Sequence, residues 1–225
     1  YISSANIACG FHAGDEATMR RTIELALENN VAIGAHPSFP DRENFGRTTL
    51  TLPPKAVFDI VTEQIRTLAE IAALQAAKLS HVKPHGALYN QSAKDIELAA
   101  AIADAVCTFD PNLILFGLSE SVSISEAKRV GLRTASETFA DRTYSSNGSL
   151  TPRSQPNALI DSEYRAVEQV LQMIESGTVT ATDGSTVNIE CDTICIHGDG
   201  EHAVVFAQRI HSELTKRGIA LRQPK

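Results

Sequence analysis

Histidine and acidic residues recur along the chain, each group directly after a short apolar run. The groups are Gly10-Phe11-His12-Ala13-Gly14-Asp15, His36-Pro37, Lys83-Pro84-His85-Gly86, Glu137 with Asp141-Arg142, and His197-Gly198-Asp199. Imidazoles and carboxylates that converge on one site can bind a divalent metal and activate water. They can equally act as general acid and base near neutral pH. The residue types fit both uses, and the sequence leaves the two open.

The groups supply two sets of candidate site residues. The catalytic candidates are His12, Asp15, His36, His85, His197 and Asp199. The substrate-binding candidates are Lys83, Tyr89, Glu137, Asp141, Arg142 and Arg153. Lysine and arginine suit a substrate carboxylate or a phosphate. A metal of unknown identity has His12, His36 and His85 as its candidate ligands.

Several of these residues also have a purely structural interpretation. Asp15 is placed to cap a helix, and His36 precedes a proline and could simply end a strand. Asp141 and Arg142 could form a surface ion pair of little energetic value. Three further histidines are predicted to lie outside the site: His81 at a strand start, and His202 and His211 solvated on the last helix.

The elements that must position these residues alternate between strand-like and helix-like segments. Strands are predicted at 2–9, 31–35, 81–83, 113–117, 132–136 and 193–197, with a short final strand beginning at Gly218-Ile219. Helices are predicted at 15–29, from Thr51 through Ile71, and at 92–108, 120–130, 161–176 and 201–217. Asp15, Thr51 and Asp161 are predicted to cap three of these helices. Leu27 and Ile96 are predicted to face the core. A polar loop over 137–160 contains the turn dipeptide Asn147-Gly148. Residues 178–182 and 186–189 are predicted to form a β-hairpin.

This alternation favours parallel strands joined by right-handed helical crossovers. Two architectures fit, a closed barrel or an open doubly wound sheet, and residues 1–225 are expected to form one domain. In both architectures, ligands bind at the carboxyl ends of the strands. The prediction of the site therefore does not depend on whether the sheet closes.

Composition narrows the classes of partner and chemistry. The net charge is −7 and no lysine or arginine cluster occurs, which argues against a nucleic acid or an anionic membrane as the partner. We find no apolar run long enough to span a bilayer and no signal peptide, and we expect a cytoplasmic protein. The four cysteines form no CxxC pair and are expected to be reduced and mostly buried. HExxH, phosphate-loop and G-x-S-x-G motifs are absent, so the chain shows no ATP motif of its own.

The sequence around these groups resembles the LamB/YcsF family. The likeness lies in SANIACGFHAGD (4–15), IGAHPSFPD (33–41), VKPHGALYN (82–90), ETFADR (137–142) and IHGD (196–199). Five stretches in the family's order span nearly the whole chain. One departure is that family members usually begin with a strand rich in Asp, Asn and Glu ahead of the first stretch. No such strand precedes Tyr1, so a missing first strand is expected.

The resemblance implies a single-domain, TIM-like β/α barrel of the glycoside hydrolase/deacetylase type, distorted or seven-stranded. It also implies one component of a bacterial 5-oxoprolinase, which opens 5-oxo-L-proline to L-glutamate with ATP as co-substrate and needs partner subunits B and C. Assembly into a homo-oligomer is left open. A stand-alone metal-dependent amide or N-acetyl hydrolase, and a non-catalytic ligand-binding protein, are the alternative functions.

Overall fold

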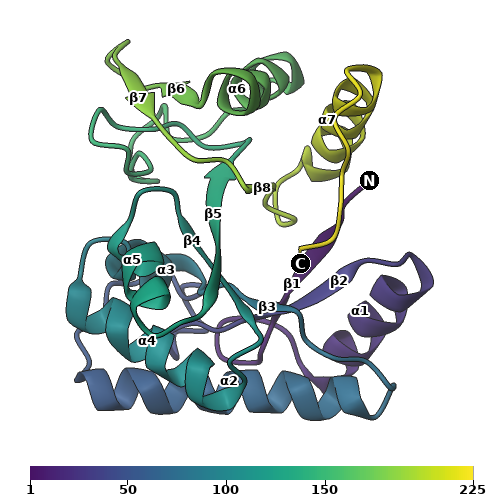
Figure 1. Ribbon diagram of the computed structural model, residues 1–225, viewed down its shortest axis with the longest axis vertical. Helices are drawn as coiled ribbons and strands as arrows, with labels where there is room; N and C mark the ends of the chain where they lie inside the picture. Colours follow the sequence, from purple (N-terminus) through teal and green to yellow (C-terminus); the bar gives the residue numbers. More distant parts are fainter. Residues whose placement is uncertain (225) are drawn as a thin grey trace. The chain divides into compact units, whose positions relative to one another are not determined.

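The computed structural model describes residues 1–224, which form an α/β fold (Figure 1). The six strands of the main sheet are β1 (Ser4–Ala8), β2 (Ala32–His36), β3 (His81–Val82), β4 (Ile114–Leu118), β5 (Arg133–Phe139) and β8 (Thr193–Cys195), in the order β1-β2-β3-β4-β5-β8. Pairing is parallel from β1 to β4 and between β5 and β8. The predicted parallel β/α class is confirmed. The described part of the chain contains six strands in this sheet.

Seven helices and one hairpin complete the described fold. The helices are α1 (Glu16–Glu28), α2 (Pro54–Ala73), α3 (Gly86–Ser92), α4 (Ile96–Phe109), α5 (Val122–Arg129), α6 (Glu163–Ser176) and α7 (Ala203–Lys216). The strands β6 (Thr178–Thr180) and β7 (Thr186–Asn188) pair antiparallel, as predicted for this hairpin. In the part of the chain that the structure describes, no helix is both long and apolar enough to cross a membrane.

The chain divides into two compact units. The larger unit consists of Ser3–Gly117, Ser121–Ala135 and the C-terminal residues from Gln223. The smaller unit consists of Tyr1–Ile2, Leu118–Glu120 and Ser136–Arg222. β5 contributes its first three residues to the larger unit and its last four to the smaller one.

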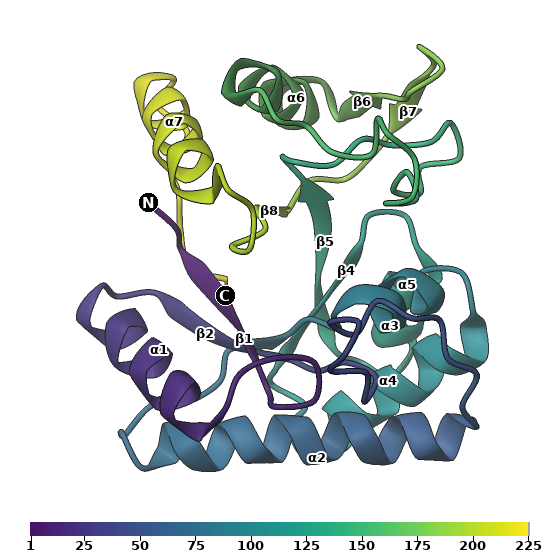
Figure 2. The same cartoon turned by 180° about the vertical axis from the view of Figure 1, so that it is seen from behind.

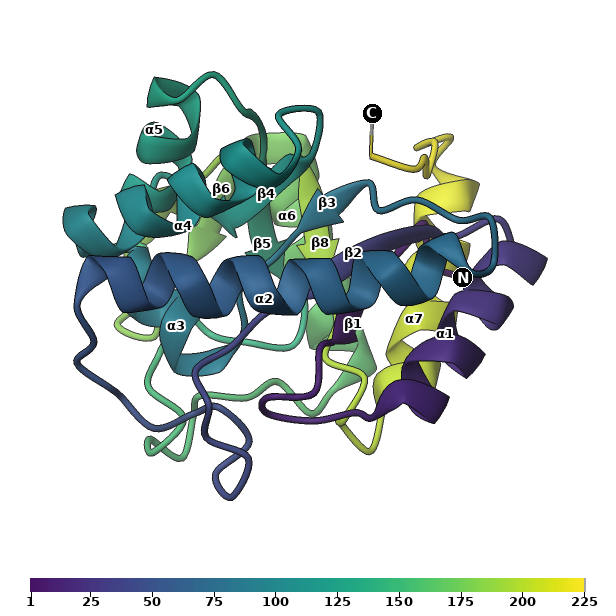
Figure 3. The same cartoon turned by 90° about the horizontal axis from the view of Figure 1, so that it is seen from below.

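The core of the larger unit is built on α2, the longest helix. α2 packs against α1 and α4, and α4 also packs against α5 (Figures 2 and 3). Apolar residues repeat along α2 with helical periodicity, and Val57, Val61, Ile65 and Leu68 are fully buried in the core cluster. This packing fixes β1, β2 and β3 from one side and so positions the loops that follow them.

The core of the smaller unit lies around α6 and α7, which pack against each other (Figure 1). Ala166, Val170, Phe206 and Ile210 are buried in this cluster. The amide of Gln169 on α6 donates to the backbone carbonyls of Phe139 and Arg142, at 2.8 and 2.9 Å. Because these bonds satisfy the carbonyl at the end of β5 and one three residues later, they fix the course of the chain around Asp141.

Several predicted boundaries were wrong, each for a local reason. Thr51 does not cap α2, because Pro54 occupies its first turn and Pro53 is the N-cap. Ser162 rather than Asp161 caps α6. Residues 92–108 are not one helix, because Asp95 caps a new helix there by accepting from Leu98 N.

Two apolar residues and one strand also differ from the predictions. Leu27 is 47% and Ile96 is 61% exposed, so neither faces the core. Leu27 lies in the last turn of α1 and Ile96 is the first residue of α4, so each lies at an end of its helix. Gly218 and Ile219 lie in a turn and an irregular segment rather than a strand.

Candidate functional site

In the larger unit, three histidines come from the carboxyl ends of adjacent strands. Ala8 at the end of β1 lies opposite His36, and Ala35 of β2 lies opposite Val82 of β3. His36 ends β2, and His12 and His85 follow β1 and β3 in loops. Parallel register therefore brings these histidines to one edge of the sheet, as predicted.

The three rings are in direct contact. The rings of His12 and His85 stack, with centroids 4.0 Å apart and planes 9° apart. The His36 ring meets His85 edge-on, with centroids 4.7 Å apart, and His85 Nδ1 lies 2.9 Å from His36 Nε2. One ring nitrogen from each of the three histidines lies within 4.8 Å of the others. We call these three residues the His cluster.

Each ring of the His cluster also has a hydrogen-bond partner outside it. His36 Nδ1 lies 2.6 Å from the backbone carbonyl of Lys83, and His85 Nε2 lies 2.8 Å from that of Phe45. His12 Nδ1 lies 2.8 Å from Ser38 Oγ. These contacts fix the orientation of all three rings.

Burial keeps the His cluster neutral. It lowers the pKa of His12 to about 4, with further lowering from Arg47 and Arg42. Burial, and then His12, lowers the pKa of His85 to about 3. Burial also holds the pKa of His36 well below its usual range, reinforced by His85 and Lys83. At neutral pH all three imidazoles therefore offer a lone pair rather than a positive charge.

The loop over residues 39–48 covers the His cluster, and its contribution was not predicted. The Phe45 ring meets both His12 and His85 edge-on, at 5.4 and 5.2 Å between centroids. Phe45 has a φ of +57°, which is strained for a bulky residue. Arg42 Nη1 donates to the carbonyls of Gly10 and Gly14 and so ties this loop to the loop carrying His12. The feature of the sequence that could have indicated this role of the loop is Gly46, which follows Phe45 in a polar segment.

The other candidates of the larger unit lie in different surroundings. Lys83 and Tyr89 are buried close together, with the ammonium nitrogen 5.6 Å from the ring centroid. Asp15 is exposed and accepts from Thr18 N at 2.8 Å, which is the N-cap contact predicted for it.

His81, which was predicted to lie outside the site, has its own set of contacts. It is buried, stacks on Phe116 and contacts Asn6 Oδ1 at 2.9 Å through Nε2. These contacts give His81 a structural role.

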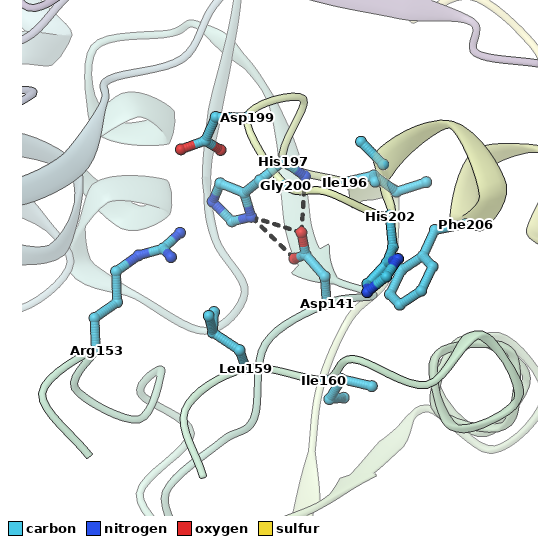
Figure 4. A pocket seen from close by; sticks show the side chains of 11 residues that line it. Asp141, Arg153, Leu159, Ile160, Ile196, His197, Asp199, Gly200, His202 and Phe206 are labelled. Atoms are coloured by element: carbon cyan, nitrogen blue, oxygen red, sulfur yellow. Dashed lines mark hydrogen bonds and ion pairs between the residues drawn. The ribbon is translucent and has the colours of Figure 1, made fainter. Parts of the chain in front are cut away.

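In the smaller unit, Asp141 and His197 form a hydrogen-bonded pair (Figure 4). His197 Nδ1 lies 2.9 Å from both carboxylate oxygens of Asp141, and the His197 backbone N–H donates to Oδ2 at 2.8 Å. Burial would raise the pKa of Asp141, but the bonds from His197 outweigh it and lower the pKa. An ionised Asp141 accepts the Nδ1 proton, which leaves His197 Nε2 as the basic nitrogen.

This pair lines a pocket whose other walls are partly apolar. The pocket is lined by Asp141, Arg153, Leu159, Ile160, Ile196, His197, Asp199, Gly200, His202, Ala203 and Phe206. Figure 4 shows Asp199 and Arg153 on the side of His197 that faces away from Asp141. His202 was predicted to be solvated on the last helix, and neither His202 nor Phe206 was among the predicted site residues.

Two further candidates of the smaller unit are buried. Arg142 is 3% exposed and donates to the carbonyls of Ala158 and Thr151. The alternative of a surface ion pair between Asp141 and Arg142 therefore does not fit, because Arg142 is inside and Asp141 holds His197. Glu137 is 1% exposed near the end of β5. The roles of both in substrate binding stay predictions.

The structure thus contains two groups of candidate residues, one in each unit. The His cluster offers three neutral imidazoles. The Asp141–His197 pair can act as a general base, and its pocket is also lined by Arg153 and Asp199. Gathering of both groups around one substrate stays a prediction.

Comparison with known proteins places the chain among close relatives. It is 52% identical over 219 residues to the 5-oxoprolinase A subunit of Bacillus subtilis (strain 168), covering 97% of this chain and 85% of that protein. It is 53% identical over 225 residues to the 5-oxoprolinase A subunit of Geobacillus kaustophilus (strain HTA426), covering 100% of this chain and 88% of that protein. The crystal structure of the lactam utilization protein from Thermus thermophilus superposes with a TM-score of 0.92 at 41% identity, covering 99% of this chain and 89% of that one.

The LamB/YcsF family model matches residues 1–225, the same family that the five sequence stretches resemble. The chain belongs to the LamB/YcsF family.

Proposed function

We propose that this chain is the A subunit of an ATP-dependent 5-oxoprolinase, which opens the lactam of 5-oxo-L-proline to give L-glutamate. The observation that carries the proposal is identity above 50%, over almost the whole chain, with proteins named for that subunit. The partners are subunits B and C, and ATP is the co-substrate of the complex. The reaction takes place in the cytoplasm, where ATP is available.

The chemistry requires an activated amide, because a lactam carbonyl resists attack by water. Transfer of the γ-phosphoryl group of ATP to the lactam oxygen turns that oxygen into part of a good leaving group. Water then adds to the ring carbon, and the ring C–N bond breaks to give the glutamate amine and a γ-carboxyl phosphate. A second water hydrolyses this carboxyl phosphate to the carboxylate and inorganic phosphate. A base must take the proton of the attacking water.

The pocket of the smaller unit supplies the groups for this step. His197, oriented by Asp141, is the base, and Asp199 lies beside it in the lining. The guanidinium of Arg153 pairs with the substrate carboxylate. The apolar side chains of Leu159, Ile196 and Phe206 suit the methylene groups of a five-membered ring.

A matched substitution tests the base. His197→Asn keeps a donor at the position of Nδ1 for Asp141 and removes Nε2. In the complex assembled with subunits B and C, we expect ATP-dependent glutamate release to fall by about 10²–10⁴ in kcat, the usual contribution of a general base. The control is His211→Asn on α7, which lies outside the pocket lining and should keep full activity. Full activity of His197→Asn would exclude His197 as the base.

The His cluster favours a second candidate function, a metal-dependent amide or N-acetyl hydrolase that acts alone. Turnover by the purified chain without ATP and without partner subunits would support this candidate. Turnover that requires both would support the first.

A further inference from the structure

The tautomers of the His cluster follow from its hydrogen-bond partners. A backbone carbonyl can only accept, so His36 Nδ1 carries a proton donated to Lys83 O, and His85 Nε2 carries a proton donated to Phe45 O. The single hydroxyl proton of Ser38 is donated to the backbone carbonyl of the next residue at 2.9 Å. His12 Nδ1 faces Ser38 Oγ and must therefore donate its proton to that oxygen.

In the neutral rings, the remaining nitrogens are bare. These are His12 Nε2, His36 Nε2 and His85 Nδ1. Two of them, His36 Nε2 and His85 Nδ1, face each other at 2.9 Å. Two lone pairs at that distance repel each other unless a positive species lies between them.

We propose that this positive species is a divalent transition-metal ion of the zinc class, bound by His12 Nε2, His36 Nε2 and His85 Nδ1. Each of these rings donates its other N–H to a carbonyl or a hydroxyl, which is the arrangement that fixes ring orientation and tautomer around protein-bound metals. Three imidazoles leave a fourth position of a tetrahedral ion for water or substrate.

Binding of one ion requires an adjustment of the three rings. Metal–nitrogen bonds of about 2.0–2.1 Å in a tetrahedral site place the nitrogens about 3.3 Å apart. The His36–His85 pair at 2.9 Å must open by a few tenths of an ångström, and the widest pair, within 4.8 Å, must close. The stacked rings of His12 and His85, with planes 9° apart, must also tilt so that both in-plane lone pairs point at one ion.

A shared proton is the competing occupant of this position. It would use only two of the three bare nitrogens, and it would place a full charge in a buried cluster near Arg42, Arg47 and Lys83. A metal ion meets the same repulsion but gains a third ligand bond and keeps a water. This inference does not depend on the proposed function, because it concerns binding by the isolated chain.

The test uses Zn²⁺ in calorimetric titrations of the chelator-treated full chain, and Co²⁺ in visible absorption titrations. We expect one ion per chain and the absorption of a tetrahedral Co²⁺ site with imidazole ligands. Three variants each remove one ligand nitrogen while keeping its donor: His12→Asn, His36→Asn and His85→Gln. Each should weaken Zn²⁺ binding by more than about a hundredfold, beyond the effect of removing an outer hydrogen-bond partner.

Two controls separate this site from surface binding and from misfolding. His211→Asn removes a histidine outside the cluster and should leave Zn²⁺ affinity unchanged. Ser38→Ala removes the partner of His12 and should weaken binding by about 10–100-fold. Circular dichroism and thermal unfolding must show that every variant is folded. A folded wild-type chain that binds neither ion, or binding that survives in the three ligand variants, overturns the proposal.

Discussion

At the residue scale, hydrogen-bond acceptors decide which nitrogen of each ring carries the proton. The grouping of His12, His36 and His85 was predictable, because strand ends in a parallel sheet meet at one edge. Their tautomers were not, because the acceptors are the Ser38 hydroxyl and two main-chain carbonyls, which a pattern of side chains does not reveal.

The tautomers are open to direct measurement in the metal-free chain. We expect ¹⁵N-edited NMR at neutral pH to show His12 and His36 protonated at Nδ1 and His85 protonated at Nε2, because each faces an acceptor there. A spectrum with the opposite tautomer at any of the three would contradict the hydrogen bonds on which the assignment rests.

The contacts of single residues also show which candidates could be predicted from the sequence. The cap at Asp15 was predictable, because a carboxylate directly before an amphipathic helix commonly accepts a hydrogen bond from a backbone N–H of the first turn. The partner of His197 was not, because Asp141 lies 56 residues away and reaches it only through the pairing of β5 with β8. Asp141 was a candidate for substrate binding, and in the structure its carboxylate is hydrogen-bonded to His197. Its role in substrate binding stays a prediction.

At the element scale, β2 depends on a glycine to accommodate a buried ring. Gly34 lies opposite His81 in the register of β2 with β3, and a β-carbon at Gly34 would overlap the His81 ring. We expect Gly34→Ala to lower the free energy of unfolding by about 1–3 kcal/mol, because neither the strand nor the packed ring can move freely.

Urea unfolding checks this expectation. Gly198→Ala is the matched control, because no heavy atom lies within 4 Å of the position its β-carbon would take, and its φ is not left-handed. An unchanged urea midpoint for Gly34→Ala would mean that the His81 ring moves aside at little cost in stability.

Element types were predictable here and element ends were less so. The apolar repeat of α2 and the alternation of strands with helices follow from burial patterns that the sequence carries. The break between α3 and α4 was missed, because the apolar pattern continues across it while the Asp95 cap ends the helical hydrogen bonding.

At the scale of the whole molecule, buried histidines couple stability to acid. Burial, and then Lys83, lowers the pKa of His81 to about 3, against 6.5 for an ordinary histidine. At pH values between about 3 and 6.5, His81 binds a proton in the unfolded chain but not in the folded chain. Stability therefore falls as the pH drops below about 6.5, by at most about 1.4 kcal/mol per pH unit from this residue.

Substitution isolates this contribution. His81→Gln keeps a donor near Asn6 and removes the titration. We expect the loss of unfolding free energy between pH 7 and pH 5 to be smaller in His81→Gln than in the metal-free wild type, by on the order of 1–2 kcal/mol. Equal losses in urea unfolding at the two pH values would show that His81 titrates normally in the folded chain.

The contact between Gly46 and Gly86 has a consequence for anyone redesigning this protein. A β-carbon at Gly86 would overlap the Gly46 carbonyl oxygen, and one at Gly46 would lie 3.0–3.2 Å from carbons of His12, His85 and Ser38. At these two glycines the cover over the imidazoles is therefore main chain with no room for a side chain, and Phe45 supplies the neighbouring side-chain contact. Engineers who want to change the surroundings of these imidazoles must substitute Phe45 or the histidines themselves, because neither glycine accepts a side chain.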